Sequence, residues 1–336
     1  MTPRRAAAAA VIAILLVFGA SPAGAHTTGG PPASNFRTEL TGLAPPSSGL
    51  VAALASDHEQ LELRVDGQHT VIVLGYRGEP YLRVDAGGVF ENMRSPSVAA
   101  NRTRIPTGAP STKTGSPRWR RVSRRPVARW HDHRAHWMGG ITPRAIRRDL
   151  DHEHVVERWT IPVHVDGRPT QIRGQIRWAP PAPAWPWWVG AVISAGVLMA
   201  LAAQPRSARA GLAAALLLMA GAEAAHLWGG WPFSSGSALG RLGEAIPSIA
   251  AIATCLGALV WLLRTNPWRS APALILAGLF VFVSGGIADL PSLSHAFIPS
   301  RVPPEVARAL IAVALGLGAG TAIAGGLRLR APRPSS

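Results

Sequence analysis

The pattern of apolar and polar positions changes near residue 185. Before it, apolar residues alternate with polar ones over short runs, and after it they form long continuous stretches. Each long stretch approaches the roughly 20 residues that a helix needs to cross the hydrocarbon core of a membrane. The pattern therefore predicts a bundle of about five transmembrane helices. They cover residues 187–203, 210–228, 245–263, 271–288 and 305–327.

The alternating runs predict β strands, because successive side chains of a strand point to opposite faces. Leu61, Leu63 and Val65 share one face, and Asp66-Gly67 predicts a hairpin turn into a strand over residues 70–76. A second Asp-Gly, at 166–167, separates two more alternating runs. Their shared faces hold Trp159, Ile161, Val163 and Val165 in the first, and Ile172, Gly174, Ile176 and Trp178 in the second.

Residues 81–85 and 89–91 predict a further hairpin, whereas residues 26–50 are rich in Pro and Gly and read as an irregular lead. Residues 100–128 read as a long exposed loop, and residues 179–186 as a Pro-rich connector. We therefore expect a chain that is α+β by segment. An immunoglobulin-like β-sandwich in residues 26–183 is followed by the transmembrane helices of residues 184–336.

The first 25 residues have the features of a secretory signal peptide. Arg4 and Arg5 precede a short apolar run that ends in small residues. Cleavage after Ala25 leaves His26 as the mature N-terminus, and cleavage after Ala23 is the alternative. The signal predicts that residues 26–183 lie outside the cytoplasm.

The arginines that flank the apolar stretches agree with this orientation. The loops predicted on one side of the membrane carry only Arg241 and Arg301, whereas the loops and terminus on the other side carry more arginines. That larger set consists of Arg206, Arg209, Arg264, Arg269, Arg328, Arg330 and Arg333. Because positive residues collect on the cytoplasmic side, we expect a multi-pass protein of the cell membrane with a cytoplasmic C-terminus.

The formal net charge of +16 raises the question of nucleic acid, but an exported domain does not meet the chromosome. We therefore expect no nucleic-acid partner. The arginine-rich stretch 118–148 is a solvated surface, a contact for anionic lipid headgroups or a contact for acidic partners. Membrane lipids, and other envelope proteins of metal homeostasis, are the expected partners.

The single cysteine, Cys255, lies in an apolar stretch, so a disulfide framework and thiolate metal sites are both excluded. A metal site must then use imidazole, thioether, carboxylate or backbone ligands. The strongest candidates all lie in the eight residues 131–138, which follow Trp130. They are His131, His133, His136 and Met138. Imidazoles beside a thioether favour copper as the bound ion. The alternative is that the tryptophans pack the core while the histidines are exposed or hydrogen-bonded.

His26 is a fifth candidate ligand, because an N-terminal His chelates copper through its α-amine and one ring nitrogen. In this one respect the chain is similar to exported copper-binding proteins. The segment Asp151-His152-Glu153-His154 either supplies further ligands or is an ordinary polar start of a strand.

Ionisable residues also occur in or beside the predicted spans, where they are costly and mark functional sites. Glu223 and His226 are three apart and so share a helix face. Glu244, Asp289 and His295 are expected at the same, outer level. Such a polar site either passes or senses a cation, shuttles protons, or ties helix ends together.

The stretches 73–76, 78–83 and 130–137 resemble exported, membrane-anchored proteins of high-GC Gram-positive bacteria. The resemblance implies the architecture above and carries no activity. Phosphate loops, nucleophile elbows and zincin motifs are missing from the sequence, so we expect no enzyme. The function expected is an envelope membrane protein that binds or delivers a transition metal, foremost copper. The alternative is a non-enzymatic envelope interaction or scaffold protein with no metal.

Overall fold

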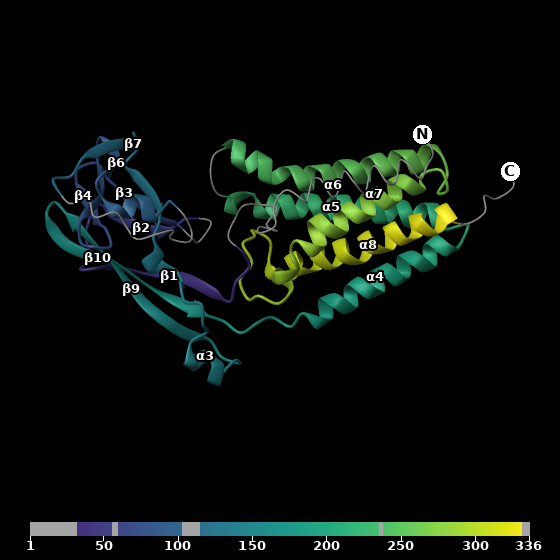
Figure 1. Cartoon of the computed structure of the whole chain (residues 1–336), viewed down its shortest axis with the longest axis horizontal. Helices are drawn as coiled ribbons and strands as arrows, with labels where there is room; N and C mark the ends of the chain where they lie inside the picture. The colour runs from purple at the N-terminus through teal and green to yellow at the C-terminus, as the bar shows by residue number, and fades with distance from the viewer. Residues whose placement is uncertain (1–31, 56–59, 103–114, 235–237, 331–336) are drawn as a thin grey trace. The chain divides into compact units, whose positions relative to one another are not determined.

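The computed structural model describes residues 32–55, 60–102, 115–234 and 238–330. The predicted signal peptide and His26 lie outside the described residues. The chain divides into two compact units (Figure 1). Residues 35–180 form a unit rich in β structure, and the remaining described residues form a helical unit. The mixed class expected from the sequence, β-rich first and helical second, is confirmed.

The β-rich unit contains two antiparallel sheets whose buried residues form one hydrophobic core. The seven-stranded sheet has the order β1-β10-β9-β4-β5-β6-β7, and the three-stranded sheet has the order β2-β3-β8. The strands of the larger sheet are β1 (Phe36–Ala44), β4 (Val71–Leu74), β5 (Pro80–Asp85), β6 (Gly88–Asn92), β7 (Trp119–Ser123), β9 (His154–Val165) and β10 (Arg168–Trp178). The smaller sheet contains β2 (Leu50–Leu54), β3 (Gln60–Val65) and β8 (Val127–His131). Short helical segments are α2 (Pro96–Ala100), η1 (His133–Ala135) and α3 (Arg144–Arg148).

The β9–β10 hairpin follows the sequence pattern closely. Asp166 and Gly167 both have positive φ, +49° and +79°, which is the backbone of a two-residue turn between antiparallel strands. The predicted inward faces of both strands are buried, from Trp159 to Val165 and from Ile172 to Trp178. The hairpin of β5 and β6 is confirmed as well.

Asp66-Gly67 does not form the predicted hairpin. β3 pairs with β2 and β8, whereas β4 pairs with β5 and β9, so this turn carries the chain from one sheet to the other. The reason is that Leu63 and Val71 are both fully buried in the core that the two sheets share. Turn chemistry alone does not distinguish a hairpin from such a crossing.

Two segments that the sequence presents as irregular contain strands. β1 lies within the expected lead and β2 begins at its last residue, while β7 and the start of β8 lie within the expected loop. β1 pairs along β10 with an irregularity between Leu40 and Gly42, which breaks the two-residue alternation. β7 is an edge strand that exposes arginines, and charged edge strands lack the apolar alternation of central ones.

The helical unit is built around α8 (Pro304–Arg330), which packs against α4 (Trp185–Ala203), α5 (Ala208–Gly230) and α7 (Ala271–Val281). α6 (Ala238–Arg264) packs on α5 and α7. α7 continues into a π-helix, η3 (Phe282–Ile287), and the short helices η2 (Trp231–Phe233) and η4 (Leu290–Leu293) lie in the connections. Among the described residues, α4, α5 with η2, α6 and α8 are long and apolar enough to cross a membrane. The predicted span over 271–288 is the exception, since its apolar helix, Ala271–Ile287, is shorter than these.

Small residues let the central helices approach closely. A Cβ on Gly278 of α7 would lie 2.6 Å from both the Gly318 carbonyl oxygen and the Ala322 amide nitrogen of α8. In an apolar solvent, close packing of this kind is a main source of helix association.

We expect Gly174→Ala to destabilise the β-rich unit, because a Cβ there would overlap the Trp159 indole and the Glu39 carbonyl oxygen. Overpacking of this kind costs about 1–3 kcal/mol. Thermal unfolding followed by tryptophan fluorescence should show a lower Tm. The matched control is Gly140→Ala, where a Cβ meets no atom within 4 Å. Equal Tm values for the two variants would contradict the packing argument.

Candidate functional sites

The predicted metal ligands lie where strand β8 runs into the short helix η1. Trp130, Asp132 and Ala135 are 5%, 0% and 1% exposed and point into the core. Asp132 caps η1 by accepting a hydrogen bond from the Arg134 amide at 3.1 Å. His131 and His133 flank this buried aspartate in the sequence and are both partly exposed.

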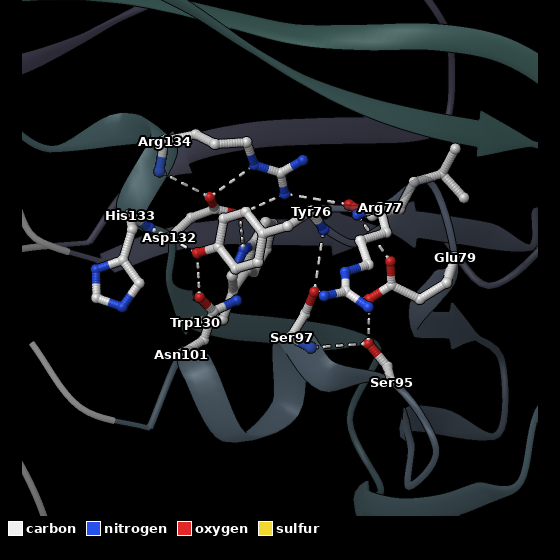
Figure 2. A network of polar contacts seen from close by, with 11 residues as sticks. Tyr76, Arg77, Glu79, Ser95, Ser97, Asn101, Trp130, Asp132, His133 and Arg134 are labelled. Carbon is white, nitrogen blue, oxygen red and sulfur yellow. Dashed lines mark hydrogen bonds and ion pairs between the residues drawn. The ribbon is translucent and has the colours of Figure 1, made fainter. Parts of the chain in front are cut away.

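The buried carboxylate of Asp132 is neutralised by Arg134. The guanidinium donates to the carboxylate from Nε at 2.9 Å and from Nη2 at 2.8 Å, and the Trp130 indole adds a third bond at 3.0 Å (Figure 2). Arg134 Nη2 also donates to the Leu74 carbonyl at 3.1 Å, and its guanidinium lies 4.8 Å from the centre of the Tyr76 ring. The ion pair therefore connects η1 to the end of β4.

Tyr76 extends this network to helix α2. Its hydroxyl accepts a hydrogen bond from the His133 amide at 2.9 Å and donates to the side chain of Asn101 (Figure 2). Burial raises the pKa of the Tyr76 phenol above its ordinary value, so it stays a neutral donor. The Tyr76 amide in turn donates to Ser97 Oγ at 3.1 Å.

Glu79 ends the network at the N-terminus of α2. It accepts hydrogen bonds from Ser95 Oγ at 2.6 Å, from Ser97 Oγ at 2.8 Å and from the Arg77 amide at 3.0 Å. Burial alone would raise the pKa of Glu79, but these bonds to the ionised form outweigh it and hold the pKa below its ordinary value. Residues 74–79, 95–101 and 130–134 thus form one polar network.

The structure brings the rings of His131, His133 and His136 together. The ring centres of His131 and His133 are 4.9 Å apart in an edge-on arrangement, and those of His131 and His136 are 4.2 Å apart and stacked. His133 Nε2 lies 2.9 Å from the Ala100 carbonyl oxygen. Because a carbonyl only accepts, Nε2 carries a proton, and in the neutral imidazole Nδ1 then keeps its lone pair.

His133 Nδ1 is buried and has no hydrogen-bond partner among the described residues. A ring with one nitrogen donating to a carbonyl and the other free is the usual state of a metal-binding histidine. The rings of His131 and His136 are stacked on each other instead. A metal lies in the plane of each imidazole that binds it, and parallel rings stacked at 4.2 Å have no such common position.

Among the described residues, no group of three or more His, Cys, Asp or Glu is arranged to hold a metal ion as it stands. Met138, the predicted thioether ligand, is 46% exposed. His152 and His154 both interact with Asp149, through its carboxylate at 2.8 Å and its carbonyl oxygen at 2.7 Å. These two histidines anchor the chain just before and at the start of β9.

In the helical unit, the structure groups three of the five predicted polar residues. Glu223 is 2% exposed and has electrostatic interactions with His226 and Asp289. His226 Nε2 lies 3.4 Å from Asp289 Oδ2. The other two have different partners. Glu244 interacts with Ser234 and Arg241, and His295 Nδ1 bonds the Pro291 carbonyl at 2.6 Å.

Sequence reasoning missed Arg308, which is 5% exposed on α8. Its guanidinium donates to the Ser292 carbonyl at 3.2 Å and to the His295 carbonyl at 2.8 Å, and so holds the loop after η4. Its position within the apolar stretch 305–327 could have marked Arg308 as a residue with a specific role. Asn101, Ser95 and Ser97 were missed as well, since no local pattern ties them to η1.

The chain was compared with known proteins, and no family model, curated protein or solved structure matches it. Its function must therefore be argued from the geometry of these sites.

We expect Asp132→Asn to destabilise the β-rich unit strongly, because it leaves the Arg134 guanidinium mostly buried without its counter-charge. Breaking a buried pair in this way costs about 3–5 kcal/mol. Chemical denaturation of the purified chain measures the loss. Asp151→Asn is the control, since Asp151 is exposed. A loss no larger than that of the control would show that the pair does not hold the unit together.

Glu79 gives a pH-dependent prediction. Its pKa in the folded state lies below its ordinary value of 4.5, so its stabilisation is present above that value and is lost as pH falls through the lower folded pKa. We expect Glu79→Gln to be less stable than the wild type at neutral pH, with the difference shrinking on acidification. Unfolding free energies measured across this range test it, and a difference independent of pH would contradict it.

Proposed function

We propose that this protein is an envelope membrane protein whose β-rich unit binds a transition metal, foremost copper, through His131, His133 and His136. The observation that carries the proposal is the gathering of three imidazoles at the β8–η1 junction, with ring centres 4.2 and 4.9 Å apart. Their backbone is fixed by the buried Asp132–Arg134 pair. Preorganised supporting residues of this kind are what a binding site needs.

His133 is the first ligand in this proposal, because its Nδ1 lone pair is free and its ring is held by the Ala100 carbonyl. Either His131 or His136 then swings out of the stacked pair to bind the same ion. Both rings are only partly buried, which leaves room for a rotation about Cα–Cβ. The exposed Met138 thioether and the predicted N-terminal His26 complete the proposed ligand set and favour copper.

The membrane placement belongs to the same proposal. It is supported by the four long apolar helices and by the arginines that flank them. The β-rich unit, with an immunoglobulin-like arrangement of its two sheets, would face outward and the C-terminus would be cytoplasmic. Delivery of the ion to the helical unit and regulation by the ion are both consistent with this placement.

A second candidate function is a metal-free interaction scaffold for another envelope component. The stacking of His131 on His136 favours it, because the two rings pack against each other without an ion. In this alternative the histidines are part of the surface that the partner contacts.

Titration of the purified full-length chain with Cu(II), Cu(I) and Zn(II) by calorimetry tests the two candidates. We expect stoichiometric copper binding that weakens by more than about 10- to 100-fold in the double variant His131→Gln/His133→Gln, because losing only a ligand's supporting hydrogen bond costs that much and here two ligands are removed. The matched control is His152→Gln, whose ring is 77% exposed and bound to Asp149. Any affinity tag rich in histidine must be removed first.

Binding no tighter than that of free histidine would overturn the metal proposal, as would equal binding by wild type and double variant. The scaffold would then be the function to pursue, by cross-linking the intact chain in its membrane.

A further inference from the structure

Glu223 is a buried carboxylate that is hydrogen-bonded, among the described residues, by two serine hydroxyls only, those of Ser248 and Ser284. It is 2% exposed on α5, and its Oε2 has no hydrogen-bond partner among the described residues. Its Oε1 lies 3.4 Å from Ser284 Oγ, but that hydroxyl is already 2.8 Å from the Phe280 carbonyl. An ionised carboxylate in an apolar interior is costly unless it is paired and hydrogen-bonded. The atom that completes this site is therefore a proton or an ordered water.

His226 lies about one turn after Glu223 on α5 and lines a cavity. Its Nε2 lies 3.4 Å from Asp289 Oδ2 and makes no hydrogen bond among the described residues. Both residues line a cavity of about 40 Å³, together with Ser292 and Ser300 and mostly apolar side chains. A cavity of this size with polar groups on its wall is large enough to hold water.

The backbone of η3 leaves space for the Glu223 side chain. Glu223 lies against Gly285, where a Cβ would overlap its Oε1. Gly285 belongs to the π-helix η3, and Asp289 follows two residues after η3 ends. π-helical turns are rare and occur frequently at functional sites.

We propose that Glu223, His226 and Asp289 form a proton-binding site within the helical unit, loaded from water in the adjoining cavity. A hydronium ion in the cavity gives its proton to the imidazole of His226 and becomes water. The imidazolium, stabilised by the Asp289 carboxylate, then gives a proton to Glu223 Oε2 directly or through a water. The imidazole returns to neutral and Glu223 becomes a neutral carboxylic acid.

A proton fits this cluster better than a metal ion, because no three of its acids and imidazoles are arranged to hold a metal in the described part of the chain. The titratable groups that face Glu223 are His226 on its own helix, Asp289 after η3 and the Cys255 thiol on α6. α6 adds the Ser248 hydroxyl. On α8, Arg308 is occupied by the carbonyls of Ser292 and His295. This inference does not depend on metal binding by the β-rich unit.

Difference infrared spectroscopy of the full-length chain in lipid nanodiscs tests the site. We expect a carboxylic-acid C=O band that changes between about pH 5 and 8, where imidazole titrates, and that shifts in D2O. Labelling with ¹³C-glutamate should shift the same band, which separates Glu from Asp without any substitution. The band should be absent in Glu223→Gln and present in the control Glu244→Gln.

His226→Gln should keep the band but slow its hydrogen–deuterium exchange roughly 100-fold, the usual contribution of a positioned proton-transfer group. Exchange as fast as in the wild type would overturn the role of His226. The absence of any exchanging, ¹³C-sensitive band would overturn the site itself, even if Glu223→Gln failed to fold. Loss of the band on addition of Zn(II) or Cu(II) to the double variant His131→Gln/His133→Gln would show a metal site instead.

Discussion

The buried ion pair between Asp132 and Arg134 is the interaction on which the rest of the β-rich unit depends. Taking two charges out of water is costly, and the structure offsets that cost only by giving both partners several hydrogen bonds. The carboxylate accepts from Arg134 and Trp130, and the guanidinium reaches the Leu74 carbonyl and the face of Tyr76. The contacts to Leu74 and Tyr76 join segments that are distant in sequence. The strand end β8, the start of η1, the end of β4 and helix α2 are therefore held in one arrangement, and the three histidine rings take their positions from it.

The helical unit treats its buried charge differently. Arg308 is satisfied by two carbonyl oxygens of a loop, and Arg328 donates to the carbonyls of Ala202 and Ala324. Glu223 has only the Ser248 and Ser284 hydroxyls as donors among the described residues, and its Oε2 has no partner there. A scaffold selected for stability alone would replace it with an apolar residue, because an unpaired buried acid is a liability. A residue that breaks the packing rule beside a π-helix and a cavity is the kind of exception that function explains. The same reasoning applies to His133 Nδ1, which has no hydrogen-bond partner in the described part of the chain.

Much of the fold could be predicted because its signals are local. The alternation in β9 and β10, with Asp166-Gly167 between them, needs only neighbouring residues to form. The crossing at Asp66-Gly67 was missed because the choice between hairpin and sheet change is made by long-range burial of Leu63 and Val71. The histidine cluster was anticipated from spacing, but its stacking was not. The residues that position it, Tyr76, Ala100 and Asn101, lie 30 or more residues before His133 in the sequence. Ala100, whose carbonyl contacts the His133 ring, is 33 residues away. Glu244 and His295 were grouped with Glu223 by depth alone, and depth does not determine which helix faces meet.

The choice between a metal protein and a scaffold comes down to the energy needed to separate His131 from His136. Stacked aromatic pairs contribute about 0.5–1.5 kcal/mol beyond their buried area. Binding of a transition metal can outweigh this, since complete structural zinc sites, with all their ligands, have apparent binding free energies of about 10–16 kcal/mol. The stacking is thus no barrier to binding, and the decisive quantity is whether the freed ring reaches the ion held by His133. That ring is attached to a backbone fixed by Thr38, whose hydroxyl donates to the Ala135 carbonyl, and by the stacking of Trp137 on Phe36. The metal proposal therefore requires a change in the side-chain torsions of His131 or His136, with this backbone left in place.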